Sequence, residues 1–166
     1  TGTLNIGFAT APTITTLTAT ASGNTVNYTA LGFNCKVTSY HHLILSGGSS
    51  PTCSVTSVAG DLTVNGTGLL TTTSSITVGG TTTVGNGRTL SNGSAFTFIS
   101  PTITAIGTGQ FTNSGIVTVS TSLDGSGLFS NGATGTLNIG FASAPTITPL
   151  TATASGNIVN YTAAAP

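Results

Sequence analysis

The feature that most limits how this chain can fold is a long internal repeat. Residues 1–30 and 134–163 read almost identically, so that position 134 corresponds to position 1. Only three positions differ, namely Thr10/Ser143, Thr16/Pro149 and Thr25/Ile158. Duplication this close indicates a repeat architecture, in which each unit is stabilised by stacking on its neighbours. We divide the chain into one full repeat, 1–133, and the start of the next, 134–166, which corresponds to 1–33.

A shorter period indicates how each repeat is built. Strands of a few residues, such as 62–64 and 117–119, alternate apolar residues with threonine, the pattern of a half-buried strand. Asn-Gly, Gly-Gly and Asp-Gly dipeptides separate these strands and supply the turns. The sequence QFTNSG at 110–115 returns in a similar form as LFSNG at 128–132. The pattern predicts an all-β chain, a right-handed parallel β-solenoid (β-helix) with about 18–20 residues per rung, so that one repeat makes about seven rungs.

An antiparallel β-sandwich is the structural alternative, because Asn-Gly between alternating strands is also typical of hairpins. Strands this short favour the solenoid. Helix formers such as Lys, Glu and Met are nearly absent, so we expect almost no helix.

The near absence of charged residues limits the classes of partner that this chain is expected to bind. Charged residues make up 2% of the chain, and they are Lys36, Arg88, Asp61 and Asp124. With only two cationic side chains to neutralise phosphates, nucleic acid is not expected as a partner, nor is an anionic membrane surface. No apolar run is long enough to span a membrane. The chain carries no leader and no initiating Met, so we expect it to be processed or cut from a longer one. A surface this neutral is poorly protected against association, which is expected of a protein that assembles.

The spacing of the two cysteines, Cys35 and Cys53, is close to the length of one predicted rung. We expect them to lie on adjacent coils and to form a disulfide outside the cytosol. Two reduced, buried thiols are the alternative.

Three stretches of sequence resemble known repeats. Residues 23–46, 60–68 and 76–87 look like the repeats of large bacterial adhesin-like surface proteins, similar to filamentous haemagglutinin and autotransporter passengers. The resemblance implies a parallel β-helix in a long, secreted protein at the cell surface, used for attachment, matrix or fibre building. It implies no catalytic residues.

No candidate active site emerges from the remaining polar residues. His41 and His42 are neighbours, so in a strand they should point to opposite faces and fail to chelate one ion. Asp61 and Asp124 should lie about three rungs apart, too far for a carboxylate pair. We therefore expect neither an enzyme, nor a metal site, nor a cofactor.

The hypothesis that these observations favour is a structural subunit of an extracellular fibre, sheath or matrix. A solenoid leaves backbone hydrogen-bonding groups unpaired only at its two ends, so further copies can continue it as tandem repeats or as a homo-oligomeric filament. The residues expected to mediate assembly are Thr1, Leu4, Ile6, Phe8, Thr136, Leu137, Ile139, Phe141 and Tyr161.

Two alternatives stay open. An adhesin would bind a carbohydrate or other surface through aromatic side chains on its lateral face, with Tyr28, Phe33, Tyr40 and Tyr161 as candidates. An ice-binding protein would use the Thr-x-Thr motifs, as at 13–15, 102–104 and 146–148. Such a face needs the motif at the same place in every rung, and the motifs are instead unevenly spread.

Overall fold

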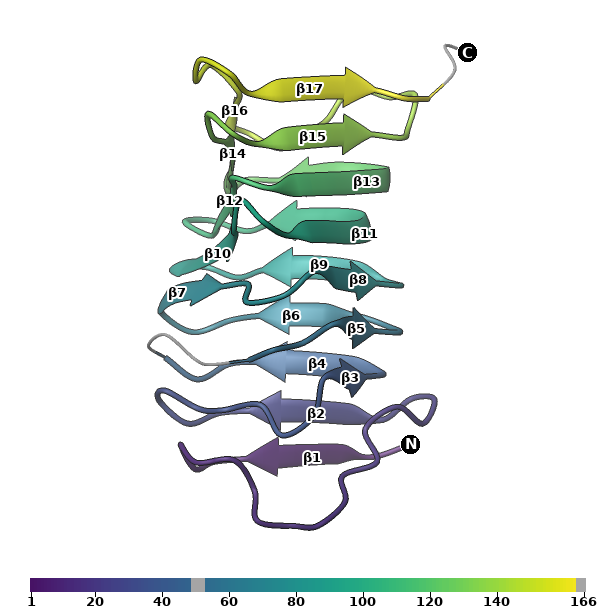
Figure 1. Cartoon of the computed structure of the whole chain (residues 1–166), viewed down its shortest axis with the longest axis vertical. Coiled ribbons are helices and arrows are strands. Elements are labelled where there is room, and N and C mark those ends of the chain that lie inside the picture. Colours follow the sequence, from purple (N-terminus) through teal and green to yellow (C-terminus); the bar gives the residue numbers. More distant parts are fainter. Residues whose placement is uncertain (49–52, 164–166) are drawn as a thin grey trace.

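All strand pairings among the described residues are parallel. The computed structural model describes residues 1–48 and 53–163, and no helix occurs in that part of the chain. The strands stack along one long axis (Figure 1) and form a parallel β-solenoid of about eight turns, with about 20 residues per rung. The solenoid prediction is confirmed, and the antiparallel sandwich is not what the chain forms.

Each turn passes three faces, which we number so that the chain runs from face 1 to face 2 to face 3 and back to face 1. Face 1 contains β3 (Ser39–Tyr40), β5 (Ser57–Val58), β8 (Ile76–Val78), the first parts of β11 (Thr97–Ala105) and β13 (Ile116–Gly125), β15 (Thr136–Ile139) and β17 (Ile158–Tyr161). Face 2 contains β1 (Thr3–Ile6), β2 (Thr25–Tyr28), β4 (His42–Leu45), β6 (Leu62–Val64), β9 (Thr81–Val84) and the second parts of β11 and β13. Face 3 contains β7 (Gly68–Thr71), β10 (Arg88–Asn92), β12 (Gln110–Asn113), β14 (Leu128–Asn131) and β16 (Leu150–Thr151).

The turns between faces explain the Asn-Gly dipeptides. Gly66 and Gly87 follow asparagines between faces 2 and 3, with φ of 85° and 77°. This left-handed conformation favours glycine because a Cβ would be strained there. The dipeptides therefore serve as solenoid corners and not as hairpin tips.

The core is a set of columns in which like side chains stack from rung to rung. Along each strand, alternate residues point inward, as in the buried positions of β9 and β10. Aromatic rings form a cluster between two of these columns: on face 3 the ring of Phe111 stacks on that of Phe129 with centroids 5.2 Å apart, and Phe98 of face 1 packs edge-on against Phe111 at 5.1 Å. All three rings are fully buried.

A second buried column is polar. The Nδ2 atom of Asn92 donates to Oδ1 of Asn113 at 3.0 Å, and Nδ2 of Asn113 donates to Oδ1 of Asn131 at 2.8 Å. The same amide groups also donate to backbone carbonyls, including that of Thr136 at 3.0 Å. Since each buried amide has partners in the rungs beside it, the column fixes the register of successive turns at the corner between faces 3 and 1.

We expect Asn113→Ala to lower the free energy of unfolding by about 2 kcal/mol, because it removes the donor to Oδ1 of Asn131 and the acceptor of the Gly115 N–H, and so leaves these buried groups unsatisfied. Asn138→Ala is the matched control. Asn138 is only half-buried and bonds to Thr118 and Asn160 on the outer surface, so its loss should cost about 1 kcal/mol or less. Urea denaturation followed by far-UV circular dichroism measures both. Equal losses in the two variants would contradict a stabilising role for the buried column.

The two copies of the duplicated segment lie on different faces. Within each copy the pairing is the same, since Leu4 pairs with Val26 and Leu137 with Val159. The first copy (β1, β2) nevertheless lies on face 2 and the second (β15, β17) on face 1, and their arrows point in opposite directions in Figure 1. From β1 the chain makes six turns to the second part of β13, then passes two more faces, β14 and β15. One repeat therefore spans six and two-thirds turns, where the sequence predicted about seven.

Candidate assembly ends of the solenoid

The upper end, formed by β17, exposes residues that are buried in the first copy. Among the described strands, β17 pairs only with β15. Tyr161 is 65% exposed, whereas its equivalent Tyr28 is 0% exposed. Tyr28 is buried because the chain continues into another rung above it. The ring of Phe33 stacks on that of Tyr28 with centroids 5.2 Å apart, and the hydroxyl of Tyr40 lies 3.0 Å from that of Tyr28. The upper end of the described solenoid therefore lacks the neighbour that this sequence has elsewhere.

The lower end, formed by β1, shows the same contrast. In the part of the chain that the structure describes, β1 pairs only with β2, and Leu4 is 41% exposed while its equivalent Leu137 is 0% exposed. The segment after β1 shows the same difference in exposure, since Ile14 is 46% exposed and its equivalent Ile147 is 4% exposed. In the second copy, residues 146–148 donate backbone hydrogen bonds to carbonyls of β13 in the rung beneath. The duplicated sequence becomes a buried rung where a rung lies below it.

The chain between β1 and β2 partly covers the lower end. In Figure 1 its trace passes below β1 before rising to β2. An open hollow of about 260 Å³ remains beside it. Its lining residues are Gly2, Thr3, Leu4, Leu17, Thr18, Asn24, Thr25 and Val26.

The residues predicted to mediate assembly divide between the ends and the interior. Thr1, Leu4, Phe8 and Tyr161 are exposed at the two ends, whereas Ile6 is buried. In the second copy, Leu137 and Ile139 are fully buried, Thr136 is half-buried and Phe141 packs partly buried against the core. Thr136, Leu137 and Ile139 lie inside the stack because β17 covers β15. The sequence reasoning overlooked that the duplicated segment contributes two strands, so Val159 in β17 and Leu17 beside β1 were missed.

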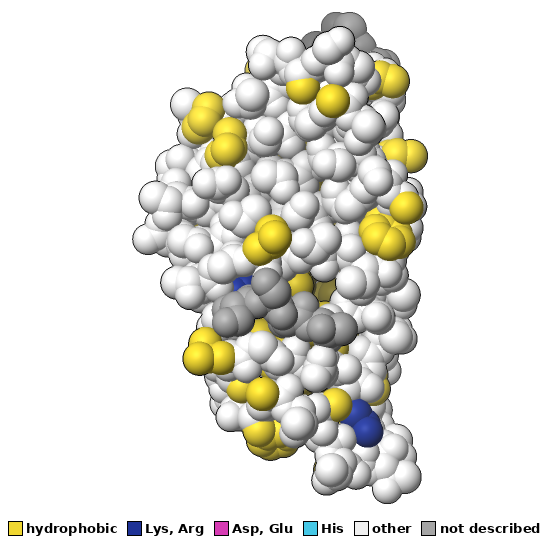
Figure 2. Space-filling model, turned by 60° about the vertical axis from the view of Figure 1, so that its left-hand side comes forward, with side chains coloured by type: hydrophobic (Ala, Val, Ile, Leu, Met, Phe, Trp, Pro, Cys, Tyr) yellow, Lys and Arg dark blue, Asp and Glu magenta, His cyan; other side chains and the backbone are white. Residues whose placement is uncertain are grey.

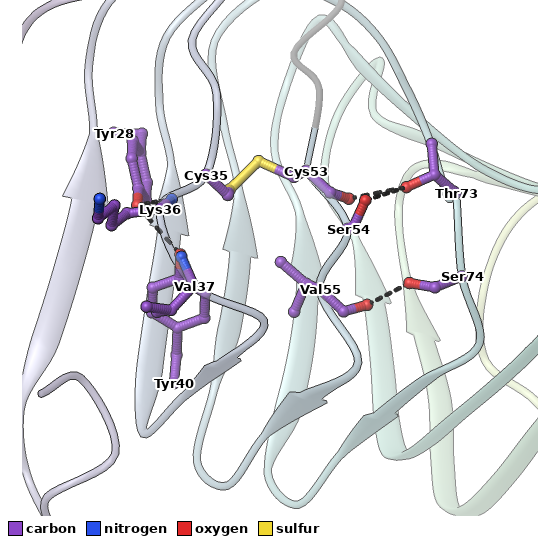
Figure 3. The surroundings of a disulfide bond; sticks show 10 residues. All are labelled: Tyr28, Cys35, Lys36, Val37, Tyr40, Cys53, Ser54, Val55, Thr73 and Ser74. Carbon is purple, nitrogen blue, oxygen red and sulfur yellow. Dashed lines mark hydrogen bonds between the residues drawn. A yellow bond between two sulfur atoms is a disulfide. The ribbon is translucent and has the colours of Figure 1, made fainter. Parts of the chain in front are cut away.

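The disulfide prediction is confirmed. Cys35 and Cys53 are bonded, with Cα atoms 4.8 Å apart on adjacent rungs (Figure 3). The rung of Cys53 is tied in turn to the next one, since the hydroxyl of Thr73 donates to the Cys53 carbonyl at 3.2 Å and that of Ser74 to the Val55 carbonyl at 2.7 Å. The disulfide therefore links the rungs of Cys35 and Cys53, and side-chain hydrogen bonds link the rung of Cys53 to the one above it.

Aromatic residues suggested as adhesin contacts belong largely to the core. Tyr28, Phe33 and Tyr40 are at most 1% exposed. Burial, followed by the hydrogen bond to Tyr28, raises the pKa of Tyr40 above its ordinary value. The backbone N–H of Lys36 donates to the Tyr28 hydroxyl at 2.8 Å, so this pair is held inside the fold (Figure 3). Only Tyr161 of the four is available at the surface.

The histidines lie at a corner, and the expectation that they point to opposite faces is wrong. The chain bends at His41 between β3 and β4, so strand alternation is interrupted and the two rings contact edge-on with centroids 4.4 Å apart. Nδ1 of His42 accepts a hydrogen bond from the Asp61 backbone N–H at 2.9 Å. Among the residues that the structure describes, no group of three or more His, Cys, Asp or Glu side chains is arranged to hold a metal ion.

The other charged groups make local contacts. Oδ1 of Asp61 accepts from the Thr81 backbone N–H at 2.9 Å, and Oδ1 of Asp124 accepts from the Thr104 hydroxyl at 2.6 Å. Arg88 is fully buried, donates to the Thr67 carbonyl at 2.6 Å, and has its pKa lowered by burial. Each of the two carboxylates thus accepts hydrogen bonds from adjacent rungs of face 2.

Hydroxyl groups form a short array on the same face. Thr81 and Thr83 pair with Thr102 and Thr104 in the adjacent rung. The Thr-x-Thr motif therefore coincides in two neighbouring rungs of face 2, while the rung above them carries Ser122 and Asp124 at these positions.

The lateral side drawn in Figure 2 shows no large apolar or charged patch on the described part of the chain. It is mostly white, with hydrophobic atoms in small separate groups and little Lys or Arg colour. Within the described residues, no helix is long and apolar enough to cross a membrane.

No family model, curated protein or solved structure matches this chain. The likeness to haemagglutinin-type passengers is therefore shown only for the architecture, a parallel β-solenoid.

Proposed function

We propose that this chain is a structural building block of an extracellular fibre, sheath or matrix, in which the solenoid continues from one copy into the next through its end rungs. The observation that carries the proposal is the paired exposure of identical residues. Tyr161 and Leu4 are exposed where a rung is missing, and Tyr28 and Leu137 are fully buried where one is present. Covering these side chains and pairing the edge strands removes apolar surface and unsatisfied backbone groups together.

The neutral surface supports the same proposal. Edge strands that must not associate usually carry charges, especially lysine. Neither β1 nor β17 contains a charged residue, so nothing on these strands opposes pairing with another copy.

An extracellular or cell-surface location is part of the proposal. Its support is the Cys35–Cys53 disulfide, since structural disulfides persist mainly in oxidising compartments.

Sedimentation velocity and negative-stain microscopy of the purified chain test the proposal. We expect concentration-dependent filaments one solenoid wide, with an axial repeat of roughly 38 Å for eight rungs at ~4.8 Å each. Tyr161→Lys should abolish them by placing a charge on the open end. Ile116→Lys is the matched control, because Ile116 is also exposed, at 44%, but points sideways from β13. A folded wild-type chain that stays monomeric at every concentration would contradict assembly through the ends. Binding of immobilised polysaccharide by such a monomer would favour the adhesin instead.

A further inference from the structure

The two ends of the solenoid share one inward-facing column on face 1. The backbone N–H of His41 donates to the Ala19 carbonyl at 2.8 Å, which places Ala19 directly beneath Tyr40 in the parallel register. From Tyr40 the column climbs through Val58, Val78, Ser100, Val119, Ile139 and Tyr161. Ala19 is therefore its lowest member and Tyr161 its highest.

The order of faces defines which strand follows β17. The chain visits face 1, then 2, then 3, as in β8, β9 and β10. β17 is on face 1, so the next position upward is on face 2, above residues 146–148, whose backbone bonds to β13. β1 of a second copy lies on face 2 and fits that position without any rotation about the axis. Its Ala19 then lies above Tyr161, and its Thr18 above Asn160.

The hollow at the lower end lies where this arrangement needs space. It borders Leu17 and Thr18, which directly precede Ala19, and Leu4 and Val26 complete its apolar wall. Its volume is about 260 Å³, and a cavity of ~150 Å³ already accommodates benzene. The exposed ring of Tyr161 can therefore enter the hollow beneath Ala19, whose side chain is a single methyl group.

From these features we infer, on the basis of the proposed function, the register of the junction: a second copy stacks in phase on the first, with its Ala19 above Tyr161 and the tyrosine ring in the hollow lined by Leu4 and Leu17. The part of the chain that passes below β1 on its way to β2 (Figure 1) then folds onto the rung beneath it. The second copy of the duplicated segment shows that this sequence does so, since Ile147 is 4% exposed and residues 146–148 bond to β13.

Paired cysteines test the register. Asn160 and Thr18 are both exposed and become neighbours on adjacent rungs ~4.8 Å apart, within reach of a disulfide. The native Cys35–Cys53 bond joins adjacent rungs at the same Cα separation of 4.8 Å. In one molecule the two positions lie at opposite ends, so any bond between them joins two molecules. We expect N160C/T18C to give a ladder of multimers on non-reducing gels that collapses to monomer with reductant.

The matched control is N160C/N5C. Asn5 is also exposed and lies in β1, and it would meet Asn160 only if the second copy were turned by one face so that β1 lay on β17. This pair should give no more linked species than N160C alone, with each variant checked for native circular dichroism. A ladder from N160C/N5C only would overturn the register while leaving end-to-end assembly intact. Wild-type filaments with no ladder from either pair would also overturn it. A monomeric wild type with no ladder would instead reject the proposed function.

Discussion

Phe111→Ala should lower the free energy of unfolding by about 4 kcal/mol, the largest loss that we expect from a single substitution in this chain. Phe111 is in contact with two other rings, Phe98 across the core on face 1 and Phe129 in the rung above, and all three are fully buried. Removing it leaves a cavity and breaks two ring contacts, each of which adds to the burial energy. Urea denaturation followed by tyrosine fluorescence and circular dichroism measures the loss.

Phe8→Ala is the matched control for this prediction. Phe8 is 52% exposed near the lower end, so the same truncation should cost under about 1 kcal/mol. Phe111→Leu keeps most of the buried volume and should fall between the two variants. If Phe111→Ala unfolds at the same urea concentration as Phe8→Ala, the aromatic cluster is not the stabilising centre of the core.

Removing the Cys35–Cys53 bond should cost about 3 kcal/mol, because the bond closes a loop of about 18 residues in the unfolded chain. The double variant C35A/C53A makes the measurement, with alanine chosen because Cys53 is only 5% exposed. Unfolding should begin in the rungs around β2 to β5, which hydrogen exchange can resolve.

Reduction provides the control for the disulfide prediction. A phosphine reductant should shift the urea midpoint of the wild type towards that of C35A/C53A and leave the variant unchanged. An unchanged midpoint in both proteins would mean that the inter-rung hydrogen bonds around Val55 and Ser74 hold this stretch without help from the crosslink.

The sequence predicts the rung and the disulfide well because both depend on local spacing. Alternation at period two identifies strands such as β6 and β9, and a sequence separation close to one rung places Cys35 next to Cys53. The corner at His41 was missed, since nothing in the residue pattern marks where a run of apolar and polar residues bends from one face to the next.

The faces of the two copies could not be predicted, because rung lengths vary and their differences add up along the chain. Thr3 pairs with Thr25, and Thr25 pairs with His42, so the first of these two rungs is several residues longer than the second. Rungs of about 19 residues would let one repeat complete seven turns. At the observed length of about 20 residues per rung, the repeat stops one face short. The position of Ala19 at the lower end of the face 1 column was missed for a related reason. Its segment has no alternating strand pattern, and only the hydrogen bond from His41 in the folded chain places it beneath Tyr40.

That shortfall of one face has a geometrical consequence for any polypeptide that continues with the same period. Each successive repeat is turned by a third of a circle relative to the one before, so an array of repeats has a threefold screw axis. A given side chain returns to the same azimuth only after three repeats, or about 20 turns, which is roughly 96 Å at ~4.8 Å per rung. Such an array would display every lateral feature in three directions, and no side of the fibre would differ from the others.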